Sequence, residues 1–190
     1  MANPENSKSN QGKVETESLP TFKYNPDPVS LGVIKKEKTI CPVCNKEREY
    51  VYVGPGSYNP EVKGTCPWCI KSGEAAKRFG CEFQDPSSCE PVDKEEYVEE
   101  LVERTPGYFG WQQEVWLSHC GDFCAIIGYV GWKEIEHLRD ELKDDIEEIL
   151  KRWGMPLSEF QRRLINGGSF QGYLFRCLHC GKHRLAVDYD

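Results

Sequence analysis

Cysteines carry the clearest chemical pattern in this chain, because ten occur and most of them are closely spaced. Three pairs have the spacing C-x-x-C, namely Cys41 with Cys44, Cys66 with Cys69, and Cys177 with Cys180. Structural zinc is held by four sulfur or nitrogen donors in a tetrahedron, and one tight C-x-x-C turn delivers two of them. Two such pairs are therefore enough to complete a zinc site.

The first two pairs predict one zinc site. Its expected ligands are Cys41, Cys44, Cys66 and Cys69. Asn45 follows the first pair, at a position where a zinc knuckle needs a left-handed backbone conformation that asparagine tolerates. Pro67 suits the first position of a helix, so Cys69 should lie on the first helical turn. A knuckle, a hairpin and a helix that carries the second pair are typical of a treble-clef or ribbon-like zinc finger.

The third pair predicts a second zinc site that takes its other ligands from the middle of the chain. Its expected ligands are Cys120, Cys124, Cys177 and Cys180. Cys120 and Cys124 form the one close cysteine pair left, and His119 is an alternate ligand for either of them. Each structural zinc ion contributes about 10 to 16 kcal/mol of apparent binding energy at neutral pH. We therefore expect two zinc ions per chain to act as cross-links of the fold.

Other uses of these residues have to be compared with structural zinc. The segment Cys66–Cys69 is similar to a redox pair, in which a helix start lowers a thiol pKa, but such a pair normally stands alone. Extracellular disulfides are disfavoured because no export signal is visible. Cys81 and Cys89 lie outside the pairs in an acidic loop, and we interpret them as plain thiols.

A catalytic zinc is the remaining alternative. It would be bound by His119, Cys177 and Cys180, with a water in the fourth position and Asp122 or Glu114 nearby. No H-x-E motif accompanies a P-C-x-x-C, as it does in nucleobase deaminases. The chain is therefore interpreted as more consistent with scaffolding zinc than with an enzyme.

Composition limits the class of protein. With 38% hydrophobic and 12% aromatic residues the chain can bury a core, so disorder is excluded for most of its length. Residues 1–18 are the exception, since they are nearly devoid of large apolar groups, and we expect a disordered tail there. The longest apolar run, residues 124–132, is shorter than the roughly 20 residues that cross a bilayer. The chain is thus predicted to be cytoplasmic and not bound to a membrane.

The charge is negative and unevenly distributed. A net charge of -7 and a pI near 5.3 disfavour binding to nucleic acid. Residues 82–104 hold nine carboxylates and two basic side chains, which matches the net charge of the whole chain. This segment is interpreted either as a solvated helix face or as a docking surface for a basic protein partner. The candidate contact residues are Glu95, Glu96, Glu99 and Glu100.

Hydrophobic periodicity and turn residues predict an α+β fold. Helices are expected at residues 70–79, 94–104, 133–153 and 157–165, the last with a cap at Ser158. Strands are expected at residues 48–53, between 114 and 132, and in two pieces between 169 and 190. The prediction is of small antiparallel hairpins around two zinc sites, with one long helix and two or three short ones. Residues 19–80 form the zinc-finger-like module, and residues 81–190 form an α+β region closed by the second zinc site.

Five motifs in a fixed order resemble the bacterial CbrC family. They are Leu19–Tyr24 (LPTFKY), Cys66–Ile70 (CPWCI), Glu103–Gln113 (ERTPGYFGWQQ), His119–Cys124 (HCGDFC) and Phe175–Gly181 (FRCLHCG). The resemblance covers residues 19–190 and implies a protein that confers tolerance of a nuclease colicin, or immunity to a related toxin. It implies no catalytic residues, and it does not extend to Cys81 and Cys89.

These observations lead to one functional hypothesis and two alternatives. The hypothesis is a zinc-stabilised protein-interaction protein that gives toxin tolerance or immunity, with a basic toxin as its partner. One alternative is an enzyme, either a zinc-dependent hydrolase or a thiol oxidoreductase. The other is a regulatory adaptor with a cytosolic protein partner.

Overall fold

Three small antiparallel sheets and a series of short helices make up the described part of the chain, residues 18–55 and 62–190 of a computed structural model. The strands are β1 Ile34–Ile40, β2 Glu47–Tyr52, β3 Ser118–His119, β4 Asp122–Phe123, β5 Ala125–Val130, β6 Phe170–Arg176 and β7 His183–Tyr189. The helices are α1 Pro67–Lys71, α2 Glu74–Phe79, α3 Glu95–Arg104, α4 Trp132–Ile135, α5 Lys143–Trp153 and α6 Leu157–Arg163, with 3-10 turns at Pro86–Ser88 and Glu136–Leu138. The predicted α+β class with antiparallel hairpins is confirmed. The expected disordered tail lies outside the described residues, apart from Ser18.

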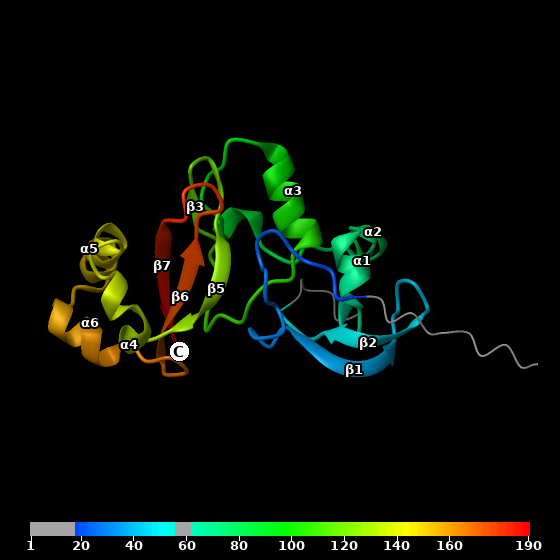
Figure 1. The fold of residues 1–190 in the computed structure, drawn as a ribbon, viewed down its shortest axis with the longest axis horizontal. Coiled ribbons are helices and arrows are strands. Elements are labelled where there is room, and N and C mark those ends of the chain that lie inside the picture. Colours follow the sequence, from blue (N-terminus) through cyan, green and yellow to red (C-terminus); the bar gives the residue numbers. More distant parts are fainter. Residues whose placement is uncertain (1–17, 56–61) are drawn as a thin grey trace, which may run out of the picture.

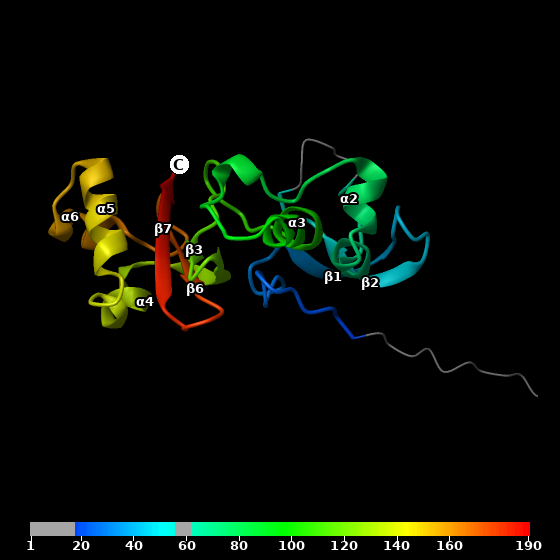
Figure 2. The same cartoon turned by 90° about the horizontal axis from the view of Figure 1, so that it is seen from above.

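The elements follow one another along an elongated molecule (Figures 1 and 2). The β1–β2 hairpin and helices α1 and α2 lie at one end, and α3 lies in the middle. The sheet β5-β6-β7 comes next, and α4, α5 and α6 cover its β7 side at the other end. The chain thus brings its two knuckle turns, after β1 and after β6, to different parts of the molecule.

The helix predicted at residues 70–79 is divided. Gly73 has a φ of 76°, a left-handed conformation that ends α1 and starts α2. Gly80, with a φ of 56°, ends α2 as the sequence predicted. The short helix α1 consequently carries Cys69, and Cys66 lies immediately before its first residue.

The single long helix predicted at residues 133–153 is wrong, because the segment breaks into α4, a 3-10 turn, a loop and α5. The apolar stripe still faces one buried cluster that includes Ile135, Leu142 and Ile146. In the loop and the first turn of α5, however, Glu141 and Asp145 accept hydrogen bonds from backbone N–H groups of β7. These contacts join the segment to β7, the edge strand of its sheet, at the place where the helix is broken.

The cap predicted for the last helix is also wrong. Helix α6 begins after Pro156, whose φ of -74° is already suited to a helix start, and no side chain caps it. Two other predictions agree with the structure: α3 ends at Arg104, just before Thr105, and β6 and β7 form the C-terminal hairpin.

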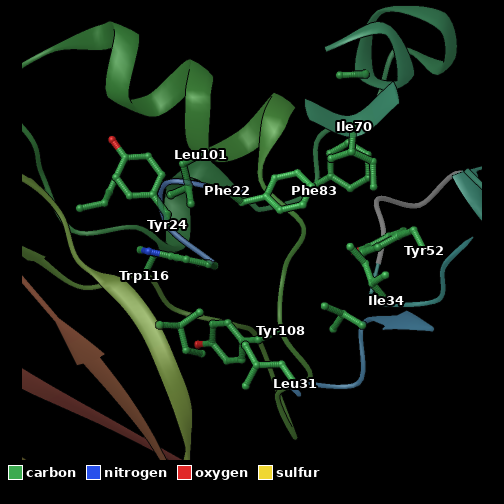
Figure 3. Packing of buried hydrophobic residues seen from close by; sticks show 14 of the residues in the cluster. Phe22, Tyr24, Leu31, Ile34, Tyr52, Ile70, Phe83, Leu101, Tyr108 and Trp116 are labelled. Carbon is green, nitrogen blue, oxygen red and sulfur yellow. The ribbon is translucent and has the colours of Figure 1, made fainter. Parts of the chain in front are cut away.

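One buried cluster joins the beginning, middle and end of the described chain. Phe22 and Tyr24 from the N-terminal segment pack with Leu101 of α3 and with Trp116 (Figure 3). Trp116 in turn meets the ring of Phe175 in β6, with ring centroids 5.7 Å apart. A second cluster lies under α4, α5 and α6. The predicted division near residue 80 stays a prediction.

Within the described residues, none of the helices combines the length and the apolar character needed to span a bilayer.

Candidate metal centres

The structure brings together the four predicted ligands of the first site. The sulfur atoms of Cys41, Cys44, Cys66 and Cys69 all lie within 4.8 Å of one another. The Cys41 and Cys69 sulfurs are 3.8 Å apart, and those of Cys44 and Cys66 are 3.9 Å apart. A tetrahedral ion with metal–sulfur bonds of about 2.3 Å separates its sulfur ligands by about 3.8 Å. The cluster therefore has the size of a tetrahedral zinc site.

Two local structures position these sulfurs. In the knuckle between β1 and β2, the N–H of Asn45 donates to the carbonyl of Cys41, and the N–H of Cys41 donates to Lys46. Asn45 has a φ of 54°, as its place after the pair predicted. Cys66 precedes α1 in an extended conformation, and Pro67 starts the helix that carries Cys69.

Burial and mutual contacts shift the pKa values of the thiols in the first cluster. Cys41, Cys66 and Cys69 are all buried. A hydrogen bond from the Cys66 thiol, helped by backbone N–H groups, lowers the pKa of Cys41 to about 4, and the same contact raises the pKa of Cys66. Burial raises the pKa of Cys69 to about 12. A divalent cation would compensate the charge of these sulfurs when the thiols lose their protons.

The second cluster differs from the predicted set in one residue. It consists of His119, Cys120, Cys177 and Cys180, whose ligand atoms lie within 4.8 Å of one another. The Cys120 and Cys180 sulfurs are 3.7 Å apart, and the Nδ1 of His119 lies 3.2 Å and 3.3 Å from them. The alternate ligand His119 therefore stands where Cys124 was expected.

Cys124 lies outside the second cluster because its side chain belongs to the core. It is fully buried among the residues around Trp116, whose indole N–H donates to the Cys124 carbonyl at 2.8 Å. Burial raises the pKa of its thiol to about 12. Cys124 lies between β4 and β5, and both of its neighbours in the chain, Phe123 and Ala125, are buried as well.

The second cluster is built from two facing turns (Figure 1). Cys120 and Gly121 form the two-residue turn between β3 and β4, and both have positive φ, 56° and 75°, as in a type I′ hairpin. Opposite it, the turn between β6 and β7 repeats the bonding of the first knuckle: Gly181 donates to Cys177 and Cys177 donates to Lys182. Gly181 has a φ of 78°, as predicted from its place after the pair.

A buried carboxylate supports the second cluster. The side chain of Asp122 is 2% exposed and accepts hydrogen bonds from Lys23 Nζ at 2.9 Å, Tyr24 Oη at 2.7 Å and His179 Nε2 at 3.0 Å. Burial opposes ionisation of Asp122, but these three donors lower its pKa. This role of Asp122 was not predicted from the sequence, where Asp122 was expected only beside a catalytic zinc. The LPTFKY motif was the available signal, because it supplies both Lys23 and Tyr24.

The donor set of the second cluster differs from the one that the catalytic alternative requires. That alternative needs a water beside His119, Cys177 and Cys180, whereas the sulfur of Cys120 is a fourth protein donor within 4.8 Å of the other three. Glu114, which the catalytic alternative expects near the zinc, accepts the backbone N–H of Gly110, and burial raises the pKa of Glu114. Four protein donors around one ion are typical of structural zinc.

Helix α3 presents three of the four candidate contact residues to solvent. Leu101 and Val102 are buried on its inner side, whereas Glu95, Glu96 and Glu99 are exposed. The fourth, Glu100, is half-buried and forms ion pairs with Lys71 at 2.6 Å and with Arg104 at 3.8 Å. Glu100 therefore attaches α3 to α1 through its ion pair with Lys71, and it is less accessible to a partner than Glu95, Glu96 and Glu99 are.

The fold and its two clusters define a small α+β protein with two candidate zinc centres. The family model described as "Uncharacterised protein family (UPF0167)" matches residues 19–189, and the chain belongs to this family. It is 41% identical over 178 residues to the UPF0167 protein Mb2317 of Mycobacterium bovis, an alignment that covers 91% of this chain and 95% of that protein. It is 38% identical over 177 residues to the UPF0167 protein PA1536 of Pseudomonas aeruginosa, covering 90% and 97%. No solved structure matches the chain significantly.

Proposed function

We propose that this protein is a non-catalytic interaction protein whose fold is held by two zinc ions, one in each cluster. One observation carries this proposal: two separate groups of four donor atoms have the dimensions of a zinc tetrahedron. Thiolate and imidazole donors favour zinc over magnesium or calcium, which prefer oxygen. Each ion would join distant segments, since the second cluster links the middle of the chain to its last hairpin.

The partner we propose is a basic protein that binds the exposed side of α3. Glu95, Glu96 and Glu99 share this side, and the surrounding segment 82–104 concentrates the negative charge of the chain. Complementary charge accelerates the encounter of two proteins and selects against acidic competitors. The resemblance to the CbrC family supports a nuclease toxin as the partner, and hence a role in toxin tolerance or immunity.

Charge reversal on α3 tests the proposed partner surface. The variant is the triple change Glu95→Lys, Glu96→Lys and Glu99→Lys, with Glu100 retained because it pairs with Lys71. Sensitive bacteria that express each variant are challenged with a nuclease colicin, and survival is compared with that given by the unchanged protein. We expect the triple variant to lose protection, since six units of charge change on one surface.

A matched control separates the α3 surface from net charge. The change Asp144→Lys, Glu147→Lys and Glu148→Lys alters net charge by the same amount on α5, where all three side chains are exposed. This control should protect as well as the unchanged protein. Equal protection by the α3 variant, with fold and zinc content intact, would remove the docking surface from the proposal.

A further inference from the structure

The two candidate centres differ sharply in how solvent reaches them. In the first cluster three of the four cysteines are buried and Cys44 is half-buried. In the second, Cys120 and Cys180 are exposed and His119 is half-buried, so that only Cys177 is buried. A small solute can therefore approach two sulfurs of the second centre without any opening of the fold.

These two exposed sulfurs also face each other. The Sγ atoms of Cys120 and Cys180 are 3.7 Å apart, whereas a disulfide needs about 2.05 Å. Both residues lie at or next to the tips of two-stranded turns, the β3–β4 turn and the β6–β7 turn. Turn tips tolerate small displacements better than strands or packed helices, so the remaining approach needs no rearrangement of the core.

We infer that Cys120 and Cys180 form a site of reversible oxidation by hydroperoxides, at which disulfide formation expels the zinc ion of the second centre. This inference rests on the proposed zinc binding. One thiolate attacks the O–O bond of the peroxide and becomes a sulfenic acid. When the oxidant is hydrogen peroxide, the leaving hydroxide takes up one proton and forms a first water. The other thiolate displaces hydroxide from that sulfur, which with a second proton gives a second water. The two sulfurs lose two electrons, the peroxide gains them, and Zn²⁺ leaves without a change of its own oxidation state.

Loss of the ion has a defined consequence, because only His119 and Cys177 remain as free donors. Two donors do not retain zinc at a tetrahedral site against solvent. A thiol reductant breaks the disulfide and restores both thiolates, so added zinc can bind again.

The oxidised turn lies beside the start of the acidic helix. The carbonyl of Gly121 accepts the N–H of Asp93 at 2.9 Å, two residues before α3, and Glu90 accepts the N–H of Ser118 at 2.6 Å. A Cβ on Gly121 would clash with the Asp93 carboxylate, which shows how closely the two segments approach. Oxidation at the second centre would therefore disturb the segment that positions the proposed partner surface.

The first centre provides an internal control within the same molecule. The spacing between its sulfur atoms is similar to that in the second centre, but Cys41 and Cys66 have no exposed surface. Cys89 is a further half-buried thiol, whose sulfur contacts the carbonyl of Asp85 at 3.4 Å. The variant Cys89→Ser removes this competing thiol and leaves both centres unchanged.

The test uses the zinc-loaded Cys89→Ser protein and hydrogen peroxide. Zinc content is measured first by elemental mass spectrometry, and release during a peroxide titration is followed with a chromogenic chelator. Non-reducing peptide mapping then identifies the disulfides. We expect two zinc ions per chain at the start, release of one, a Cys120–Cys180 disulfide, and recovery of the second ion after a thiol reductant and zinc are added.

Three results would contradict the inference, and they are distinguishable from failure of the proposed function. Selective oxidation of Cys120 and Cys180 would be overturned if both ions stay bound or if both are released together. It would also be overturned if one ion is released and the disulfide forms among the cysteines of the first centre. A protein that holds no zinc before peroxide is added would instead overturn the proposed zinc centres, and this inference with them.

Discussion

Arg184 forms a half-buried ionic cluster that ties β7 to two distant segments. Its Nε lies 3.0 Å and 3.1 Å from the two carboxylate oxygens of Asp145 in α5. Its two terminal nitrogens reach the carboxylate of Glu90 at 3.0 Å and 3.1 Å, and one of them also donates to the carbonyl of Ser118. Every nitrogen of the guanidinium is therefore engaged.

We expect the change Arg184→Met to lower the free energy of unfolding by about 3 to 5 kcal/mol, the usual cost of removing one partner of a buried ion pair. Methionine keeps much of the side-chain volume, so the loss is mainly of charge compensation. The side chains of Arg184 and Asp145 are only 19% and 12% exposed, and burial already raises the pKa of Asp145. Without the arginine, Asp145 must stay unpaired or take up a proton, and either response costs free energy.

A double-mutant cycle separates the ion pair from general damage. Asp145→Asn retains an oxygen for the N–H of Leu185 and removes the charge, and it is combined with Arg184→Met. We expect the double variant to be more stable than the sum of the two single effects by more than about 1 kcal/mol. Each variant is unfolded with urea in the presence of zinc, and tryptophan fluorescence and circular dichroism report the transition.

An exposed ion pair supplies the matched control. Arg152 lies 2.7 Å from Glu148 along α5, but their side chains are 64% and 67% exposed. Arg152→Met should therefore cost less than about 1 kcal/mol. If Arg184→Met costs no more than Arg152→Met, the reasoning from burial and charge pairing is refuted.

Three further predictions follow from single positions. His119→Ala should lower zinc content from two ions per chain to one, whereas Cys124→Ala should retain both; the reverse result would restore the ligand set first expected from the sequence. Gly172→Ala should lower the free energy of unfolding by about 1 to 3 kcal/mol, because its Cβ would lie 2.8 Å from a methyl group and 2.9 Å from a carbonyl of β5. The Cβ of Gly128→Ala meets nothing within 4 Å, so this control should change the free energy of unfolding by less than about 0.5 kcal/mol. Equal urea midpoints for the two variants would contradict this prediction. A backbone N–H of β7 lowers the pKa of Glu141 below its ordinary value of 4.5. The ionised Glu141 therefore stabilises the folded protein fully above pH 4.5, and this stabilisation is lost as the pH falls through the lowered pKa of the folded state. The difference in unfolding free energy between the unchanged protein and Glu141→Gln should accordingly close below pH 4.5, and a constant difference from pH 7 to pH 3 would disprove the assignment.

Local patterns predicted the parts of the fold that are decided by a few neighbouring residues. The two knuckles depend on a C-x-x-C spacing followed by Asn45 or Gly181, and both residues have the positive φ that was expected. The C-terminal hairpin and α3 were predicted for the same reason, since their periodicity and end signals lie within one short segment. The first cluster needed only two such local units to meet.

Long-range contacts explain what the sequence did not reveal. Whether His119 or Cys124 joins the second cluster depends on how the β3–β4 hairpin packs against Trp116, which spacing alone does not determine. The break in the predicted long helix coincides with hydrogen bonds from β7 to Glu141 in the loop and to Asp145 in α5. The role of Asp122 was similarly hard to predict, because its donors Lys23 and Tyr24 lie far from it in the sequence, near the start of the described residues.

The most direct test of the two zinc centres is elemental mass spectrometry of the protein purified under reducing conditions, combined with native mass spectrometry of the intact chain. Both methods should give two zinc ions per chain for the unchanged protein, and one ion each for Cys66→Ser and for Cys177→Ser. A metal-free protein that is nevertheless fully folded, or cysteines 41, 44, 66 and 69 joined as disulfides under those conditions, would contradict the assignment.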